Sequence, residues 1–236
     1  MSFLPQLPLP AEAEAPLESS SVEPSRVRSA QVPTRGSAGE TIVLRSLRSD
    51  ETALFTEHLA RLDPETRRLR FGNPVNDTFL SRYADLALSS DAVIKGCFVD
   101  GVLRGVGELR FLSGDRADAE GAFCLERPFQ GRGLGDRLFE RLVTAARNRG
   151  VHRLFLTCLR ENRRMQRIAD HHGAELSFTG SDVIAEIRRP YADAGSVARE
   201  WRDESEAFVF AMLDWRRRGL GRLAAPFRRL AAGFRD

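Results

Sequence analysis

The most restrictive feature of the chain is a glycine-rich segment, Gln130 to Asp136, placed directly between a strand-like stretch and a helical stretch. The stretch before it, Ala119 to Leu125, is mainly apolar, and residues 134–149 after it carry apolar side chains at helical spacing. Glycines at such a junction allow backbone N–H groups to converge on an anion at the positive end of the helix. The segment therefore predicts either a phosphate or pyrophosphate cradle or a tight turn, within an α/β fold.

Two common kinds of phosphate cradle do not match this segment. A dinucleotide-binding fingerprint requires glycine at the position of Asp136, and a P-loop requires Gly-Lys-Ser/Thr, which the segment lacks. The sequence thus favours another type of anion site.

The order of elements predicts a mixed α/β domain over residues 41–189. Asp100 and Gly101 favour a tight hairpin turn between strands Ala92 to Val99 and Val102 to Phe111. The other expected elements are a strand from Thr41, a helix carrying Leu54 to Leu62 that ends at Asp63 and Pro64, a helix from Asp77, the strand Ala119 to Leu125, a helix from Leu134 to Arg149, a strand from Val151 to Leu159, a helix from Glu161 to His172 and a strand pair from Leu176 to Ile187.

Both flanks differ in composition from this domain. Residues 1–40 hold six of the eleven prolines and predict a disordered, Pro-rich tail. Residues 190–236, the C-terminal extension, predict an Arg-rich amphipathic helical segment, since 215–236 contain seven arginines and one acid. Its apolar face either docks on the domain or a second subunit, or the segment contacts an anionic membrane or an acidic protein. Nucleic acid is not expected, because no base-reading motif accompanies the charge.

The composition of the chain indicates where the protein is located and whether its cysteines bind a metal. The longest apolar run, Ala207 to Leu213, is far shorter than the about 20 residues that span a bilayer, and the N-terminus does not resemble a secretory signal, so a cytoplasmic protein is expected. The cysteines Cys97, Cys124 and Cys158 lie singly and without ligand spacing. They predict buried thiols, with no disulfide and no metal.

Two motifs resemble those of a known family. Gln130-x-x-Gly133-x-Gly135 resembles the acetyl-CoA-binding motif of the GNAT acetyltransferase superfamily, and Asn162 followed by Met165 and Gly173 resembles the next signature of that family. The resemblance covers residues 41–189. It implies the GNAT acyl-CoA N-acyltransferase fold, a mixed central sheet flanked by helices, here with a helical C-terminal extension.

The same resemblance implies acetyl-CoA as cosubstrate and assigns residues to its parts. The strand would bind the pantetheine amides, the glycine-rich segment the pyrophosphate, and Asn162 the pantetheine arm. The implied cofactor-binding residues are Phe123, Cys124, Leu125, Gln130, Gly131, Arg132, Gly133, Leu134, Gly135, Asp136, Asn162 and Met165. Arg132, Arg163 and Arg164 are either contacts of the 3′-phosphate or a solvated surface.

Catalysis in this family is direct attack of an amine on the thioester, which requires a general base. Glu120 matches the position of the catalytic glutamate in several members, and Glu108 on the preceding strand is the competing candidate. Many members carry a tyrosine that protonates the departing thiolate, but this sequence has Ala169 there, so water is the expected proton donor. His171 and His172 are interpreted as helix-end caps.

The acceptor is predicted from a shorter resemblance. Arg61 to Phe71 resembles a stretch of the GNAT domain in bacterial protein-lysine acetyltransferases. It implies acetyl transfer to a primary amine, with a protein lysine as the favoured acceptor. Two alternatives stay open: a small-molecule amine, such as an antibiotic, and a non-catalytic acetyl-CoA sensor or scaffold.

Overall fold

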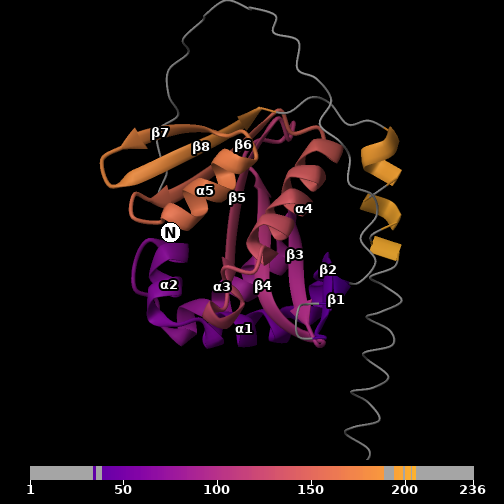
Figure 1. Cartoon of the computed structure of the whole chain (residues 1–236), viewed down its shortest axis with the longest axis vertical. Helices are drawn as coiled ribbons and strands as arrows, with labels where there is room; N and C mark the ends of the chain where they lie inside the picture. Colours follow the sequence, from indigo (N-terminus) through magenta and orange to yellow (C-terminus); the bar gives the residue numbers. More distant parts are fainter. Residues whose placement is uncertain (1–33, 36–38, 189–193, 199, 203, 206–236) are drawn as a thin grey trace, which may run out of the picture. The chain divides into compact units, whose positions relative to one another are not determined.

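A computed structural model describes residues 34–35, 39–188, 194–198, 200–202 and 204–205 (Figure 1). The predicted N-terminal tail lies almost wholly outside the described residues, although Thr34–Arg35 form a short strand, β1. Of the C-terminal extension, the described residues are helical, and residues 206–236 lie outside the described part.

Strands and helices alternate as a mixed α/β domain, and the expected fold class is confirmed. The strands form one sheet in the order β1-β2-β3-β4-β5-β6-β8-β7, in which only β5 and β6 are parallel neighbours. The remaining elements, in chain order, are β2 (Thr41–Ser46), the 3-10 turn η1 (Ser49–Glu51), α1 (Thr52–Arg61), α2 (Pro64–Phe71), α3 (Asp77–Ser89), β3 (Ala92–Val99), β4 (Val102–Phe111), β5 (Asp118–Leu125), η2 (Arg127–Phe129), α4 (Leu134–Asn148), β6 (Arg153–Leu159), α5 (Arg163–His171), β7 (Glu175–Thr179) and β8 (Asp182–Arg188).

Helices cover both faces of the sheet, and each face has its own apolar core. On one face α4 and α5 bury side chains such as Phe139 and Met165 against the sheet. On the other face α1 and α3 bury Phe55 and Leu80. The hairpin turn between β3 and β4 forms at the predicted dipeptide, where Asp100 and Gly101 both have positive φ, at 49° and 75°.

Helix α2 was not predicted as a separate helix. Asp63 and Pro64 follow the end of α1, as expected, but they also begin α2. The Asp63 side chain accepts a hydrogen bond from the Thr66 N–H at 3.1 Å, and Pro64 occupies the first turn. An acidic cap followed by proline is a common helix start, so the signal was present in the sequence.

The sheet divides between β5 and β6. These strands pair only from Asp118 opposite Arg153 to Glu120 opposite Phe155. Beyond that point β5 stays paired with β4 as far as Leu125, while β6 stays paired with β8. Within the described part of the chain, no strand pairs with the facing edge of β5 from Gly121 onward, so its backbone groups are available to a ligand.

The described part of the C-terminal extension contacts α4 and β3. Glu200 accepts hydrogen bonds from Asn148 at 2.7 Å and from Arg149 at 2.8 Å. Lys95, the only lysine of the chain, forms ion pairs with Glu200 and Glu204 and is 4% exposed. These contacts fix the beginning of the extension on the domain.

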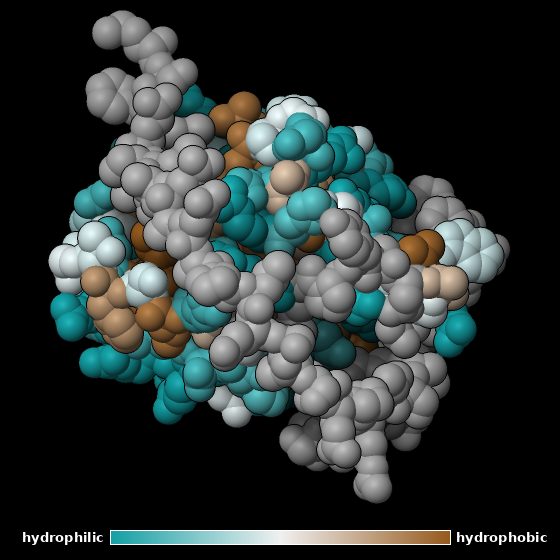
Figure 2. Space-filling model, turned by 90° about the horizontal axis from the view of Figure 1, so that it is seen from above, coloured by the Kyte–Doolittle hydropathy of each residue, from teal (hydrophilic) through white to brown (hydrophobic). Residues whose placement is uncertain are grey.

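The surface of the described residues is mainly hydrophilic on the face seen in Figure 2, where the apolar side chains form small separate groups. Among the described helices, none combines the length and the apolar character needed to cross a membrane.

Candidate active site

A cavity of about 470 Å³ lies next to the edge at which β5 separates from β6. It is walled by the end of β5, by α2, by α5 and by the beginning of α4. Its lining residues are Thr66, Leu69, Arg70, Phe123, Cys124, Leu125, Gln130, Gly131, Gly133, Gly135, Asp136, Asn162, Arg164, Met165, Arg167, Ile168 and His171.

The glycine-rich segment forms the start of α4. Gly131 and Gly133 have φ values of 73° and 74°, a left-handed conformation that glycine adopts at little cost. Gly133 is the N-cap residue and, having no side chain, leaves the first N–H groups of α4 uncapped. An uncapped helix N-terminus that borders a cavity is suited to bind an anion.

Gln130 connects three walls of the cavity. Its amide nitrogen donates to the Leu125 carbonyl at 2.8 Å and to the Thr66 hydroxyl at 3.3 Å, while its amide oxygen accepts from Arg164. The glutamine therefore holds β5, α2 and α5 around the glycine-rich segment.

Asn162 begins α5 and borders the cavity. Its side-chain oxygen accepts from the Met165 N–H at 3.2 Å, as an N-cap. Among the described residues, its side-chain nitrogen has no hydrogen-bond partner, so this donor is available to a ligand. Met165 is nearly buried beside it.

The cavity brings together all the predicted cofactor-binding residues except Arg132 and Leu134. Leu134 is buried in the core, and the Arg132 side chain pairs with Glu40. Of the other arginines considered for the 3′-phosphate, Arg164 lines the cavity, and Arg163 donates to Gln166 at 3.0 Å.

Sequence reasoning missed the lining residues of α2 and most of those on α5. Thr66, Leu69 and Arg70 lie in the segment quoted for its resemblance to protein-lysine acetyltransferases, yet nothing in their local pattern placed them beside the glycine-rich segment. Arg167, Ile168 and His171 follow the predicted Asn162 at helical spacing, and that spacing was the available signal.

The two candidate bases share one face of the sheet but differ in surroundings, and neither lines the cavity. Glu108 is 2% exposed and accepts hydrogen bonds from Arg70 at 2.5 Å, Tyr83 at 2.7 Å and Arg110 at 3.1 Å. Burial alone would raise the pKa of Glu108, but the charges of the two arginines hold this pKa below its ordinary value. Both carboxylate oxygens of Glu108 thus accept hydrogen bonds from neighbouring side chains.

Glu120 lies at the branch point of the sheet, opposite Arg110 on β4 and Phe155 on β6. Its side chain is half-buried. Among the described residues, its carboxylate has no hydrogen-bond or ion-pair partner, in contrast to Glu108. Of the two candidate bases, Glu120 is therefore the one whose carboxylate oxygens can still accept a proton or a hydrogen bond.

Cys124 lines the cavity, and its thiol lies 3.6 Å from Nε2 of the buried His58. Burial raises the pKa of the Cys124 thiol to about 12. Glu126 next to it accepts hydrogen bonds from Arg61 and Arg104 at 2.8 Å each and lies 3.2 Å from His58 Nδ1. Cys97, Cys124 and Cys158 are all free and buried, as predicted.

The residue at the position of the family tyrosine, Ala169, lies in the hydrophobic core. Ala169 is 1% exposed and packs in the cluster beneath α4 and α5. Tyr83, the tyrosine among the described residues, donates to Glu108 instead, and Tyr191 lies outside them.

The sheet divides beside an uncapped helix N-terminus, at the place of the two motifs that resemble those of acyl-CoA-dependent transferases. A model of the acetyltransferase (GNAT) family matches residues 57–174. "Acetyltransferase PA5475" of Pseudomonas aeruginosa is 27% identical over 133 residues, which cover 54% of this chain and 72% of that protein. The chain belongs to the GNAT acetyltransferase family and is an acetyl-CoA-dependent N-acetyltransferase, as the motifs predicted.

Solved structures share the fold. The GNAT domain of S. lividans PAT superposes with a TM-score of 0.58 at 22% identity, covering 68% of this chain and 96% of that one. The structure of yncA from Salmonella typhimurium, with its cofactor acetyl-CoA, gives a TM-score of 0.51 at 18% identity and covers 65% of this chain and 99% of that one.

Proposed function

We propose that this enzyme transfers the acetyl group of acetyl-CoA to the amine of a protein lysine, with Glu120 as the general base. The observation that carries the proposal is the cavity beside the divided sheet, which has an uncapped helix N-terminus at one end and an unpaired strand edge along its wall.

The layout of β5 suits an extended cosubstrate. The cradle at Gly131 and Gly133 follows the end of β5 at Leu125, whereas Glu120 lies at the branch point of the sheet. Leu125 lies five positions after Glu120 along the strand, a distance of about 16 Å. A pantetheine arm that runs along the free edge from the cradle carries its thioester toward the branch point and toward Glu120.

Glu120 is a better base than Glu108 because its carboxylate is free to accept a proton. Glu108 is held ionised by Arg70 and Arg110, and its oxygens are occupied by three donors. A carboxylate with a lowered pKa is a weak proton acceptor. Glu108 therefore acts as a positioning residue, which holds Arg70 in the cavity wall.

The proposed reaction is a direct transfer of the acetyl group from coenzyme A to the lysine amine. Glu120 accepts a proton from the lysine ammonium, directly or through water, and the neutral amine attacks the thioester carbonyl carbon. The C–N bond forms and the C–S bond breaks, so that coenzyme A leaves as a thiolate and the new amide nitrogen loses its second proton to solvent water. Water protonates this thiolate, because Ala169 occupies the position of the family tyrosine.

A protein lysine is favoured by the segment from Arg61 to Phe71. This segment resembles the corresponding stretch of bacterial protein-lysine acetyltransferases, and it forms the end of α1 and all of α2. Thr66, Leu69 and Arg70 from this segment line the cavity. The part of the chain that carries the resemblance is thus next to the proposed site of transfer.

The experiment combines calorimetric titration of acetyl-CoA into the full chain with thiol release in the presence of lysine peptides and of small amines. Lysine-dependent thiol release supports the proposal. Release with small amines alone overturns the protein acceptor, and binding without release from any amine overturns the enzymatic assignment of the cavity. Self-acetylation adds little background, because the single lysine, Lys95, is buried.

Glu120→Gln and Glu108→Gln distinguish the two candidate bases. Glu120→Gln is expected to bind acetyl-CoA as the wild type does and to lower kcat about 100-fold or more. Glu108→Gln is expected to lower thermal stability, because Arg70 and Arg110 lose their counter-charge, while the folded fraction keeps the pH dependence of the wild type. Full turnover by Glu120→Gln across the pH range would exclude Glu120 as the base.

A further inference from the structure

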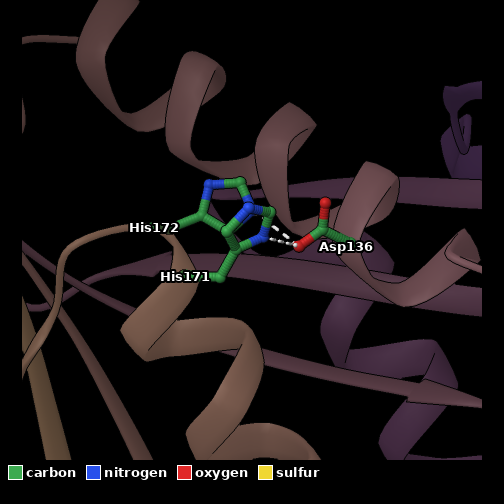
Figure 3. Close-up of side chains that lie close together, drawn as sticks. All are labelled: Asp136, His171 and His172. Carbon is green, nitrogen blue, oxygen red and sulfur yellow. Dashed lines mark hydrogen bonds and ion pairs between the residues drawn. The ribbon is translucent and has the colours of Figure 1, made fainter.

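Three side chains with metal-ligating atoms meet between α4 and α5. Asp136 lies in the first turn of α4, and His171 and His172 lie at the end of α5. Figure 3 shows both imidazole rings turned toward the same carboxylate oxygen. His171 Nδ1 is 2.8 Å from Asp136 Oδ1, and His172 Nε2 is 3.1 Å from it. All three ligand atoms lie within 4.8 Å of one another.

These separations match the coordination sphere of a small divalent cation. Zinc binds imidazole nitrogen at about 2.0–2.1 Å and carboxylate oxygen at about 2.0–2.2 Å. Two such ligands are then about 3.0 Å apart at a right angle and about 3.4 Å apart at the tetrahedral angle. The two nitrogen–oxygen distances, 2.8 and 3.1 Å, are therefore close to the separation of two ligands on one bound ion.

The surroundings hold one of the three side chains in place and leave the other two accessible to solvent. His172 is 15% exposed and packs edge-on against Phe139, with ring centroids 4.9 Å apart, so its ring is held in place. His171 is 72% exposed and Asp136 37%, which leaves a path for an ion from solvent. Asp136 and His171 also line the cavity described above.

We propose that Asp136, His171 and His172 form a binding site for a borderline divalent cation of the zinc, cobalt or nickel class. Two imidazoles and one carboxylate are a ligand set that such cations accept, with a further position left for water or another ligand. Binding replaces the two hydrogen bonds by metal–ligand bonds, and each neutral imidazole then carries its proton on the ring nitrogen that does not face the ion. This proposal departs from the expectation of no metal, which was based on the isolated positions of the three cysteines.

Cobalt and zinc are the probes, added separately to the full chain prepared without a histidine tag. We expect saturable binding of one zinc ion per chain by calorimetry and visible absorption bands from bound cobalt that zinc abolishes. Zinc is also expected to raise the unfolding temperature, because it binds only the folded arrangement.

Single substitutions locate the site. His171→Gln, His172→Gln and Asp136→Asn are each expected to weaken zinc binding about tenfold or more and to remove the cobalt bands. His152→Gln is the matched control, because His152 is exposed and lies in the loop before β6. It should leave zinc affinity unchanged.

Three results would overturn the proposal: an absence of saturable binding, affinity retained in both His171→Gln and His172→Gln, or an equal loss in His152→Gln. If the residues serve only as a clasp between α4 and α5, the variants lower thermal stability while neither zinc nor cobalt binds the wild type. The unfolding temperature of each variant without metal separates loss of a ligand from loss of the fold.

Discussion

Replacing Gly133 by alanine tests whether the start of α4 binds the phosphates of acetyl-CoA. Gly133 has a φ of +74°, and a Cβ atom added there meets nothing within 4 Å. The cost of Gly133→Ala is therefore backbone strain rather than a clash, about 1–2 kcal/mol. For a domain of this size, each 1 kcal/mol lowers the unfolding temperature by about 2–4 °C.

Gly150 gives a matched control at the other end of α4. Its φ is +77°, an added Cβ is again in open space, and it does not line the cavity. Gly150→Ala should lower thermal stability about as much as Gly133→Ala. The two variants then differ in their position relative to the cavity and not in the strain that they introduce.

The difference is expected in acetyl-CoA binding. Relaxation of the strained backbone at residue 133 turns N–H groups away from the phosphates. A hydrogen bond to a charged group contributes about 1.5–3 kcal/mol. Calorimetric titration should thus show acetyl-CoA affinity about 10-fold to 100-fold lower for Gly133→Ala and unchanged for Gly150→Ala. Wild-type affinity in Gly133→Ala, or an equal loss in both variants, would refute the cradle.

Three further predictions concern the interior. Burial opposes ionisation of Glu126, but hydrogen bonds from His58, Arg61 and Arg104 lower the pKa of this carboxyl to about 2. The resulting stabilisation is fully present above about pH 4.5 and is lost as the pH falls toward 2. In urea titrations, Glu126→Gln should therefore lower the free energy of unfolding at pH 7 by about 2 kcal/mol and make this free energy less dependent on acid pH. The thiols Cys97 and Cys124, whose pKa values burial raises to about 11 and about 12, should react with Ellman's reagent at pH 8 only after unfolding; prompt reaction of the native chain would contradict their burial. Ala169→Tyr should lower the unfolding free energy by about 1–3 kcal/mol without raising kcat, since residue 169 is packed in the core; a stable and faster variant would show that the site accepts the family tyrosine.

Local patterns in the sequence were sufficient for much of the fold. The hairpin at Asp100 and Gly101, the amphipathic helix from Leu134 and the glycine-rich segment before it are properties of neighbouring residues, and the structure has each of them. The capping of α5 by Asn162 is also local, since it depends on a residue three positions away, although the sequence analysis did not predict it. Asp63 and Pro64 also indicated the start of helix α2, but the sequence analysis interpreted Pro64 only as the end of the preceding helix.

Contacts between distant residues could not be predicted in this way. The separation of β5 from β6 depends on where their pairing stops, and the wall that α2 contributes to the cavity depends on how the chain returns to β5. The proposed preference for Glu120 over Glu108 rests on such contacts, because Arg70 forms an ion pair with Glu108 and Tyr83 donates a hydrogen bond to it, both from helices distant in the chain. The sequence by itself determined the family and every major element except α2, since these depend on local spacing. Only the tertiary structure decided which carboxylate lacks a partner among the described residues and which side chains meet, such as Asp136 and the two histidines, because charges and hydrogen bonds act between residues that are distant in the chain.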